Sequence, residues 1–152
     1  MYILKIGDEK YKIQYTYRTL WETDIIDNVV SLGTTVDREN PAGMLKSIIG
    51  LTAEMLLVGL QAHHKDEFGY SDDEEYKQRL CEVMDLMDEY EAENTDEDGN
   101  ITKNGFTLFT ELQGELERNG FLSAMVRGVQ QDATLVPQDH QKPTRRKPGA
   151  KK

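Results

Sequence analysis

The hydrophobic residues near the start of the chain alternate with polar ones, which is the period of a half-buried β-strand. Four apolar residues follow this alternation: Tyr11, Ile13, Tyr15 and Tyr17. Residues 2–6 form a short apolar run before them, and residues 7–10 have the composition of a turn. This pattern predicts a β-hairpin over residues 1–17. We expect it to pack on helices, because two isolated strands are only marginally stable in water.

After residue 17 the apolar positions recur at gaps of three and four, which predicts helices. The first is expected over Thr19–Leu32, where Thr19 and Glu22 match a capping box. Its predicted inward face holds Trp21, Ile25, Val29 and Leu32. The second is expected over about residues 42–64, behind Pro41. Its predicted inward residues are Leu45, Ile48, Ile49, Met55, Leu56 and Leu60.

Glycines interrupt the second helix at positions 50 and 59. A glycine inside a helix costs about 1 kcal/mol relative to alanine. Gly50 and Gly59 therefore weaken the helix locally, mark close contacts with a neighbouring element, or, near Gly50, mark a break. The segment from Leu51 to Ala62 is apolar over most of its circumference. Such a helix is typical of the centre of a small domain, covered from several sides.

Two further helices and a short last one are expected beyond Tyr70. The capping box Ser71-Asp72-Asp73-Glu74 starts the third helix, whose stripe holds Tyr76, Leu80, Val83, Met87 and Tyr90. The fourth helix follows a break over residues 91–105 and turns Phe106, Phe109, Leu112 and Leu116 inward. The last is expected over Phe121–Gln131. The predicted fold class is α+β, mostly α, with the N-terminal hairpin packed on a bundle of about four to five helices.

The charge of the chain is unevenly spread. The 152 residues carry a net charge of −10 and suggest one domain, expected over residues 1–136. Residues 137–152 contain three prolines and six basic residues against Asp139, so we expect a disordered basic tail there. This tail carries +5, which leaves −15 on the remainder. Such an acidic body repels nucleic acid, so nucleic acid is not an expected partner unless the tail binds it.

Cysteine and apolar content indicate the compartment. The single cysteine, Cys81, allows no internal disulfide, in keeping with a reducing compartment. Charged residues such as Lys5 and Asp8 interrupt any N-terminal apolar run that could serve as a signal peptide. The longest apolar run, Met55–Leu60, is far shorter than the roughly 20 residues that a bilayer requires. We therefore expect a soluble, cytosolic protein that does not contact a membrane.

The segment that follows the apolar helix is the first candidate for metal chemistry. On a continuous helix His63 and Glu67 lie four residues apart, and His64 and Glu67 lie three apart, so two ligands could converge. Adjacent histidines point about 100° apart on a helix, and the sequence offers no third ligand at a suitable spacing. Our interpretation is a helix C-terminus whose histidines and Lys65 face the negative end of the helix dipole, without a metal.

Residues 94–105, NTDEDGNITKNG, are similar to the calcium loop of an EF-hand. Asn94, Asp96 and Asp98 hold ligand positions 1, 3 and 5, and Gly99 holds the turn position. Position 12, a bidentate glutamate in EF-hands, is Gly105 here. An acidic connector between two helices is the main interpretation. A Ca²⁺-binding interaction module that uses this loop is the alternative function.

Catalytic motifs are missing from the sequence. It contains no G-x-S-x-G, P-loop, G-x-G-x-x-G or H-E-x-x-H, and its carboxylates lie on periodic polar faces. We therefore expect no enzymatic activity, no catalytic residues and no cofactor.

Three parts of the chain, in this order, resemble the tail assembly chaperones of long-tailed bacteriophages and of prophages of Gram-positive bacteria. The first is the hairpin that leads through residues 15–20 into a helix. The second and most specific is the family-marker segment, which contains Leu56, Gly59, Leu60, Gln61, His63, His64, Asp66, Glu67 and Phe68. The third is the acidic helix after Tyr70 with its Phe- and Leu-rich successor.

This resemblance covers about residues 1–130 and implies a small, mostly helical protein without enzymatic activity. Members of this family coat the tape measure protein, keep it soluble and help recruit tail tube subunits. They leave before the tail is complete, which implies a location in the host bacterial cytoplasm and not in the mature virion. The methionines of the helices suit varied apolar partners if they are exposed. Homo-oligomerisation is a further expectation.

Overall fold

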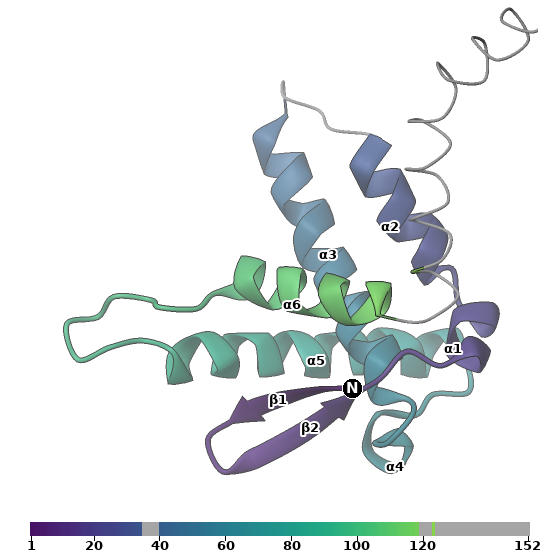
Figure 1. Ribbon diagram of the computed structural model, residues 1–152, viewed down its shortest axis with the longest axis horizontal. Coiled ribbons are helices and arrows are strands. Elements are labelled where there is room, and N and C mark those ends of the chain that lie inside the picture. Colours follow the sequence, from purple (N-terminus) through teal and green to yellow (C-terminus); the bar gives the residue numbers. More distant parts are fainter. Residues whose placement is uncertain (35–39, 119–122, 124–152) are drawn as a thin grey trace, which may run out of the picture. The chain divides into compact units, whose positions relative to one another are not determined.

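The computed structural model describes residues 1–34, 40–118 and 123. The chain divides into two compact units, Met1–Leu116 and Glu117–Lys152, and the elements below belong to the first except for the end of the last helix. They are β1 (Tyr2–Ile6), β2 (Glu9–Ile13), α1 (Tyr17–Glu22), α2 (Ile25–Thr34), α3 (Pro41–Leu60), α4 (Lys65–Phe68), α5 (Asp73–Glu93) and α6 (Gly105–Glu117) (Figure 1).

The predicted fold class is confirmed: the protein is mostly helical, and a two-stranded antiparallel hairpin packs on several helices. The predicted helix over residues 121–131 lies outside the described residues except for Ser123. The predicted boundary at residue 136 and the basic tail over residues 137–152 also lie outside them.

The hairpin is shorter, and its turn tighter, than the sequence predicts. It ends at Ile13 and not at residue 17, because Tyr17 begins α1 and is 67% exposed. Strands β1 and β2 pair from Tyr2↔Ile13 to Ile6↔Glu9, so only Gly7 and Asp8 connect them. Gly7 has a φ of 60°, in the left-handed region where glycine carries no steric penalty. Strand β2 packs on α3 and strand β1 packs on α5. Leu4, Ile6 and Ile13 are buried, which explains how so small a sheet is stable.

The expectation of one helix over Thr19–Leu32 is wrong, because the chain forms two helices there. The N-cap of α1 is Thr16, whose side chain forms a reciprocal capping box with Thr19. Thr23 then adopts an extended backbone, and its hydroxyl donates to the carbonyl of Thr19, which ends α1 before α2 begins. The break turns Trp21 outward. This residue was expected to face the core but is 89% exposed.

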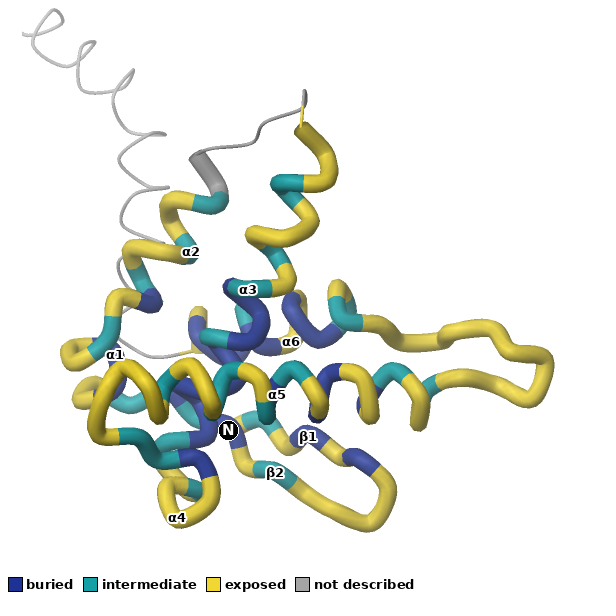
Figure 2. The backbone as a smooth tube through the Cα atoms, turned by 180° about the vertical axis from the view of Figure 1, so that it is seen from behind, coloured by how far each residue is buried: buried dark blue, intermediate teal, exposed yellow. Residues whose placement is uncertain are grey.

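Helix α3 is the centre of the domain only over its second half. Every residue from Leu51 to Leu60 except Glu54 is buried, and α2, α4, α5 and β2 pack on α3. Burial of Met55, Leu56 and Leu60 was predicted and is confirmed. Burial of Leu45 and Ile49 was also expected and is wrong, because the first half of α3 extends beyond α4, α5 and β2 (Figure 2), while α2 runs beside another face of it.

The length and mean hydropathy of α3 would also permit a membrane span. Its most apolar window has a mean hydropathy of 1.5, and half of that window is buried inside the protein. The core helix of a soluble domain can have the same length and mean hydropathy. The expectation that the protein does not contact a membrane therefore stays a prediction.

Helices α5 and α6 complete the core. Asp72, one residue later than expected, caps α5 by accepting a hydrogen bond from the backbone N–H of Glu75. Val83, Met87 and Tyr90 are buried as predicted. On α6, Phe109, Leu112 and Leu116 are buried as predicted and Leu108 joins them. Phe106 is 61% exposed, which corrects its predicted inward position.

Candidate functional site

The two histidines of the family-marker segment do not lie on a helix that continues from α3. Helix α3 ends at Leu60, short of the predicted residue 64, and His64 is the N-cap of the short helix α4. The backbone N–H of Lys12 donates to Nε2 of His64 at 2.9 Å, and Nε2 of His63 lies 2.7 Å from Oε1 of Gln14. The continuous helix that would bring both histidines toward Glu67 is therefore not formed. Their side chains contact the end of the hairpin instead.

The remaining marker residues are mostly structural. Leu56, Gly59 and Leu60 are buried in the core. The side-chain amide of Gln61 donates to the carbonyls of Leu57 and Phe68, so it joins the end of α3 to α4. The ring of Phe68 is buried, whereas Asp66 and Glu67 are exposed in the first turn of α4. Over residues 1–34 and 40–118, no three histidine, cysteine or acidic side chains are grouped so that they could hold a metal ion.

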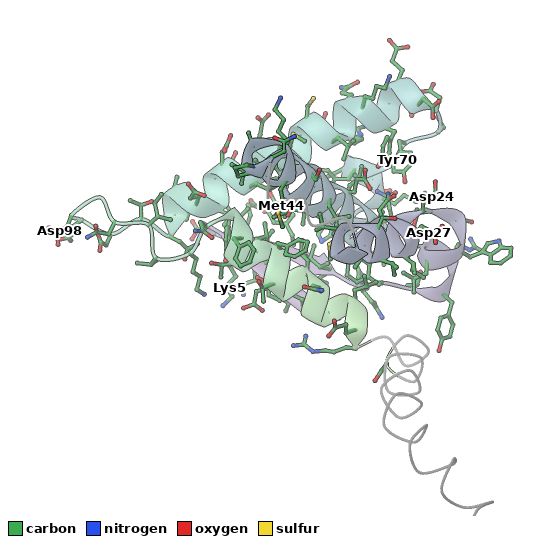
Figure 3. All side chains as sticks on the ribbon, turned by 90° about the horizontal axis from the view of Figure 1, so that it is seen from above. Lys5, Asp24, Asp27, Met44, Tyr70 and Asp98 are labelled. Atoms are coloured by element: carbon green, nitrogen blue, oxygen red, sulfur yellow. The ribbon has the colours of Figure 1, made fainter. Side chains whose placement is uncertain are left out.

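The EF-hand-like segment is a small hairpin-like loop that extends beyond α5; Figure 3 labels Asp98 within it. Thr95 and Ile101 form an isolated bridge, and Gly99 takes a φ of 84° at the turn. The carboxylate of Asp96 accepts hydrogen bonds from the backbone N–H groups of Asp98 and Asn100, at 3.0 and 2.8 Å. These bonds, chiefly those from Asn100, hold the pKa of Asp96 below its usual value.

Two of the three predicted calcium ligands thus form hydrogen bonds with the backbone of the loop or of the helix before it. The amide nitrogen of Asn94 donates to the carbonyl of Tyr90 at 2.7 Å, and Asp96 is bonded as described above. Both N–H groups bond to Oδ1 of Asp96, whereas position 12, the bidentate ligand of an EF-hand, is Gly105. The calcium-binding alternative remains a hypothesis.

An apolar groove beside the exposed half of α3 is the site that sequence reasoning missed. We call it the α3–α6 groove. It has a volume of about 270 Å³ and is lined by Leu45, Ile48, Ile49, Thr52, Met87, Glu91, Asn104, Gly105 and Phe106. Three of the large apolar side chains exposed on the described part of the protein line it: Leu45 at 58%, Ile49 at 41% and Phe106 at 61%. They come from two helices that are far apart in sequence.

The groove is mainly apolar and open to solvent. Single exposed apolar residues are common, but several gathered around one hollow are typical of an interaction site. Met87 provides a polarizable, adaptable base that can accommodate different apolar side chains. The stacked rings of Phe106 and Phe109, whose centroids lie 6.1 Å apart, anchor one rim. The lining residues include no histidine, lysine or cysteine.

Comparisons with known proteins add no assignment to this geometry: no family model matches the chain, and neither does any curated protein or solved structure.

Proposed function

We propose that this protein is a noncatalytic tail assembly chaperone of a long-tailed bacteriophage or prophage. In this role it binds the tape measure protein, keeps it soluble and helps recruit tail tube subunits in the host cytoplasm, without remaining in the mature virion. The observation that carries the proposal is the α3–α6 groove, in which Leu45, Ile49 and Phe106 remain exposed although the fold has a well-covered core.

The shape of the groove indicates how it would bind. Leu45, Ile49 and Thr52 follow one another at helical spacing, so they form a straight ridge along α3, and Phe106 lines the groove from α6. A groove between a ridge and an aromatic rim suits the apolar face of an amphipathic helix, whose anchors recur at gaps of three and four. We expect segments of the unassembled tape measure protein to present such a face to the groove.

The charge of the protein supports the same role. The described surface is strongly acidic, and high net charge of one sign keeps a protein soluble while it carries an apolar partner. Burial of a leucine or phenylalanine side chain in the groove would contribute about 1.5–3 kcal/mol each, before the costs of association. A few such anchors give reversible binding, which suits a chaperone that leaves before assembly is complete.

The test is co-expression with the tape measure protein encoded in the same gene cluster. We expect the tape measure protein to be soluble and to co-purify with this protein. Leu45→Ser/Phe106→Ser should lose that effect while keeping its circular dichroism spectrum. The matched control is Trp21→Ser/Val30→Ser, which replaces two exposed apolar residues outside the groove and should solubilise the tape measure protein normally.

Two outcomes would count against the proposal. If the tape measure protein is equally soluble and unbound without this protein, the chaperone function is wrong. If both double variants lose activity equally, the groove is not the binding surface. The expected homo-oligomer is checked with the same proteins by sedimentation: an oligomer that the groove variant alone dissociates would mean that a second copy occupies the groove.

A further inference from the structure

A second hollow lies on the opposite side of α3, and its chemistry differs from that of the α3–α6 groove. We call it the acidic cleft. It has a volume of about 510 Å³ and lies where the α1–α2 junction, α3 and the start of α5 meet. Glu54 and Val58 line it from α3, whereas Leu45, Ile49 and Thr52 line the α3–α6 groove from the other face of that helix. The two sites can therefore be occupied and tested independently.

The cleft combines an apolar base, an aromatic wall and an acidic rim. Ile25 and Val58 are buried at the base. Tyr70 and Tyr76 form the wall, with ring centroids 4.9 Å apart and planes at 69°. Tyr70 and Asp24 come from segments far apart in sequence and lie on the same side of the protein (Figure 3). Five carboxylates complete the lining: Glu22, Asp24, Glu54, Asp72 and Asp73.

These carboxylates have no cationic partner within the described part of the chain. The cleft is lined by no lysine, arginine or histidine, and the described ion pairs, Met1–Glu115 and Arg79–Glu82, lie outside the lining. Glu54 accepts a hydrogen bond from the neutral amide of Asn28 at 2.8 Å, and Asp72 caps α5. Like charges brought together without a counter-charge repel one another. Burial, and after it the charges of Glu54 and Asp24 nearby, raises the pKa of Tyr76 to about 12.

We propose that the acidic cleft binds a lysine- or arginine-bearing segment of a partner protein. A long basic side chain has an aliphatic stem and a cationic end. The apolar base suits the stem, the tyrosine faces attract the cation, and the carboxylates accept its N–H groups. Among the described residues, no three carboxylate, histidine or cysteine side chains are grouped so that they could hold a metal ion. This assignment rests on charge complementarity and does not depend on the phage function.

Binding of a defined basic peptide to the full-length protein tests the proposal. The probe is a short fluorescein-labelled peptide of alternating lysine and alanine, followed by fluorescence anisotropy. We compare wild type with Asp24→Asn/Glu54→Gln, which keeps the shape of both side chains. The matched control is Asp85→Asn/Glu89→Gln, which removes the same charge from the exposed face of α5. Circular dichroism verifies that each variant is folded.

We expect the cleft variant to bind the peptide about tenfold more weakly than wild type. It loses two partly exposed ion pairs, each of which strengthens binding by up to about fivefold. The control should change the affinity by less than about twofold, since its charges lie on another surface. Tyr70→Leu should also weaken binding, whereas Tyr70→Phe should keep it, because the ring face is what attracts the cation. Equal weakening by both charge variants would overturn the proposal, since it would show nonspecific attraction to an acidic protein. Failure of the peptide to bind wild type would overturn it as well.

Discussion

Gly59 of α3 lies so close to Ile13 of β2 that a side chain at position 59 would occupy the space of the Ile13 Cγ2 methyl group. The backbone N–H of Gln14 donates to the carbonyl of Gly59 at 3.0 Å, so strand and helix meet backbone to backbone. The hydroxyl of Tyr15 donates to the carbonyl of Met55 at 2.7 Å, one helical turn earlier. These contacts attach the hairpin to the central helix.

The first prediction is that Gly59→Ala destabilises the protein although alanine favours a helix. The gain in helix propensity is about 1 kcal/mol, and the overlap with Ile13 costs about 1–3 kcal/mol, so we expect a net loss. The matched control is Gly50→Ala on the same helix, where an added Cβ meets no atom within 4 Å. It should stabilise the protein by about 0.5–1 kcal/mol. Urea unfolding midpoints measure both, and a stabilised Gly59→Ala would refute the close contact.

The second prediction concerns the core of α3. Leu56→Asp and Leu60→Asp should each unfold the domain, because both side chains are fully buried and an unpaired carboxylate there costs several kcal/mol. Leu45→Asp introduces the same charge at an exposed position of that helix and should remain folded. Circular dichroism distinguishes these outcomes. A soluble, fully folded Leu60→Asp protein would show that the core has been misplaced.

The third prediction is that Tyr15→Phe lowers stability by about 1 kcal/mol, because the carbonyl of Met55 loses a buried donor. Burial, with Glu115 as the secondary cause, raises the pKa of Tyr15 above its ordinary value of 10.0. The unfolded chain therefore releases this proton first as the pH rises above about 10, so folding stability is full below that pH and falls above it. Tyr15→Phe should show a shallower alkaline loss. An unchanged alkaline slope would mean that Tyr15 does not contribute to it.

The fourth prediction concerns the hairpin contacts of the histidines. His63→Ala/His64→Ala should loosen the end of β2 without unfolding the domain, since both bonds are exposed and each contributes about 0.5–1.5 kcal/mol. Hydrogen exchange at the amide of Lys12 should accelerate, while exchange in the buried half of α3 should change little. Tape measure binding should remain largely intact, because neither histidine lines the α3–α6 groove. Loss of binding by a folded variant would place the histidines in the binding surface.

The fifth prediction tests the calcium-binding alternative. Calorimetry should show no micromolar Ca²⁺ affinity in wild type, because position 12 of the loop, the bidentate glutamate of an EF-hand, is Gly105. The loop itself should lose order in Asp96→Ala/Asp98→Ala, seen as faster hydrogen exchange at Asn100. Because the pKa of Asp96 is lowered in the folded loop, its bonds are present at neutral pH and are lost as the pH falls below the usual carboxylate range. Micromolar binding that disappears in the double variant would favour the calcium-binding module.

The sequence alone determined the fold class, the hairpin and the core stripe of α5, because alternation and three–four spacing are local consequences of strand and helix geometry. It also marked the buried half of α3, where apolar residues surround the helix. Gly50 and Gly59 looked alike in the sequence. Only the tertiary structure showed that Gly59 meets Ile13 while Gly50 faces open space.

The two proposed binding surfaces depend entirely on the tertiary structure. Leu45 and Phe106 follow the same apolar spacing as core residues, and an apolar pattern states which face of a helix avoids water but not whether a neighbour covers it. The helix break at Thr23 was also hidden, because the extended backbone of Thr23 and the bond from its hydroxyl to the carbonyl of Thr19 leave no trace in the apolar spacing. The carboxylates of the acidic cleft come from three segments of the chain, residues 22–24, residue 54 and residues 72–73, so no local pattern could group them. The spacing of apolar residues along the chain fixes the local conformation. Which side chains stay exposed, and which distant residues meet at one site, follow from how the helices and strands pack.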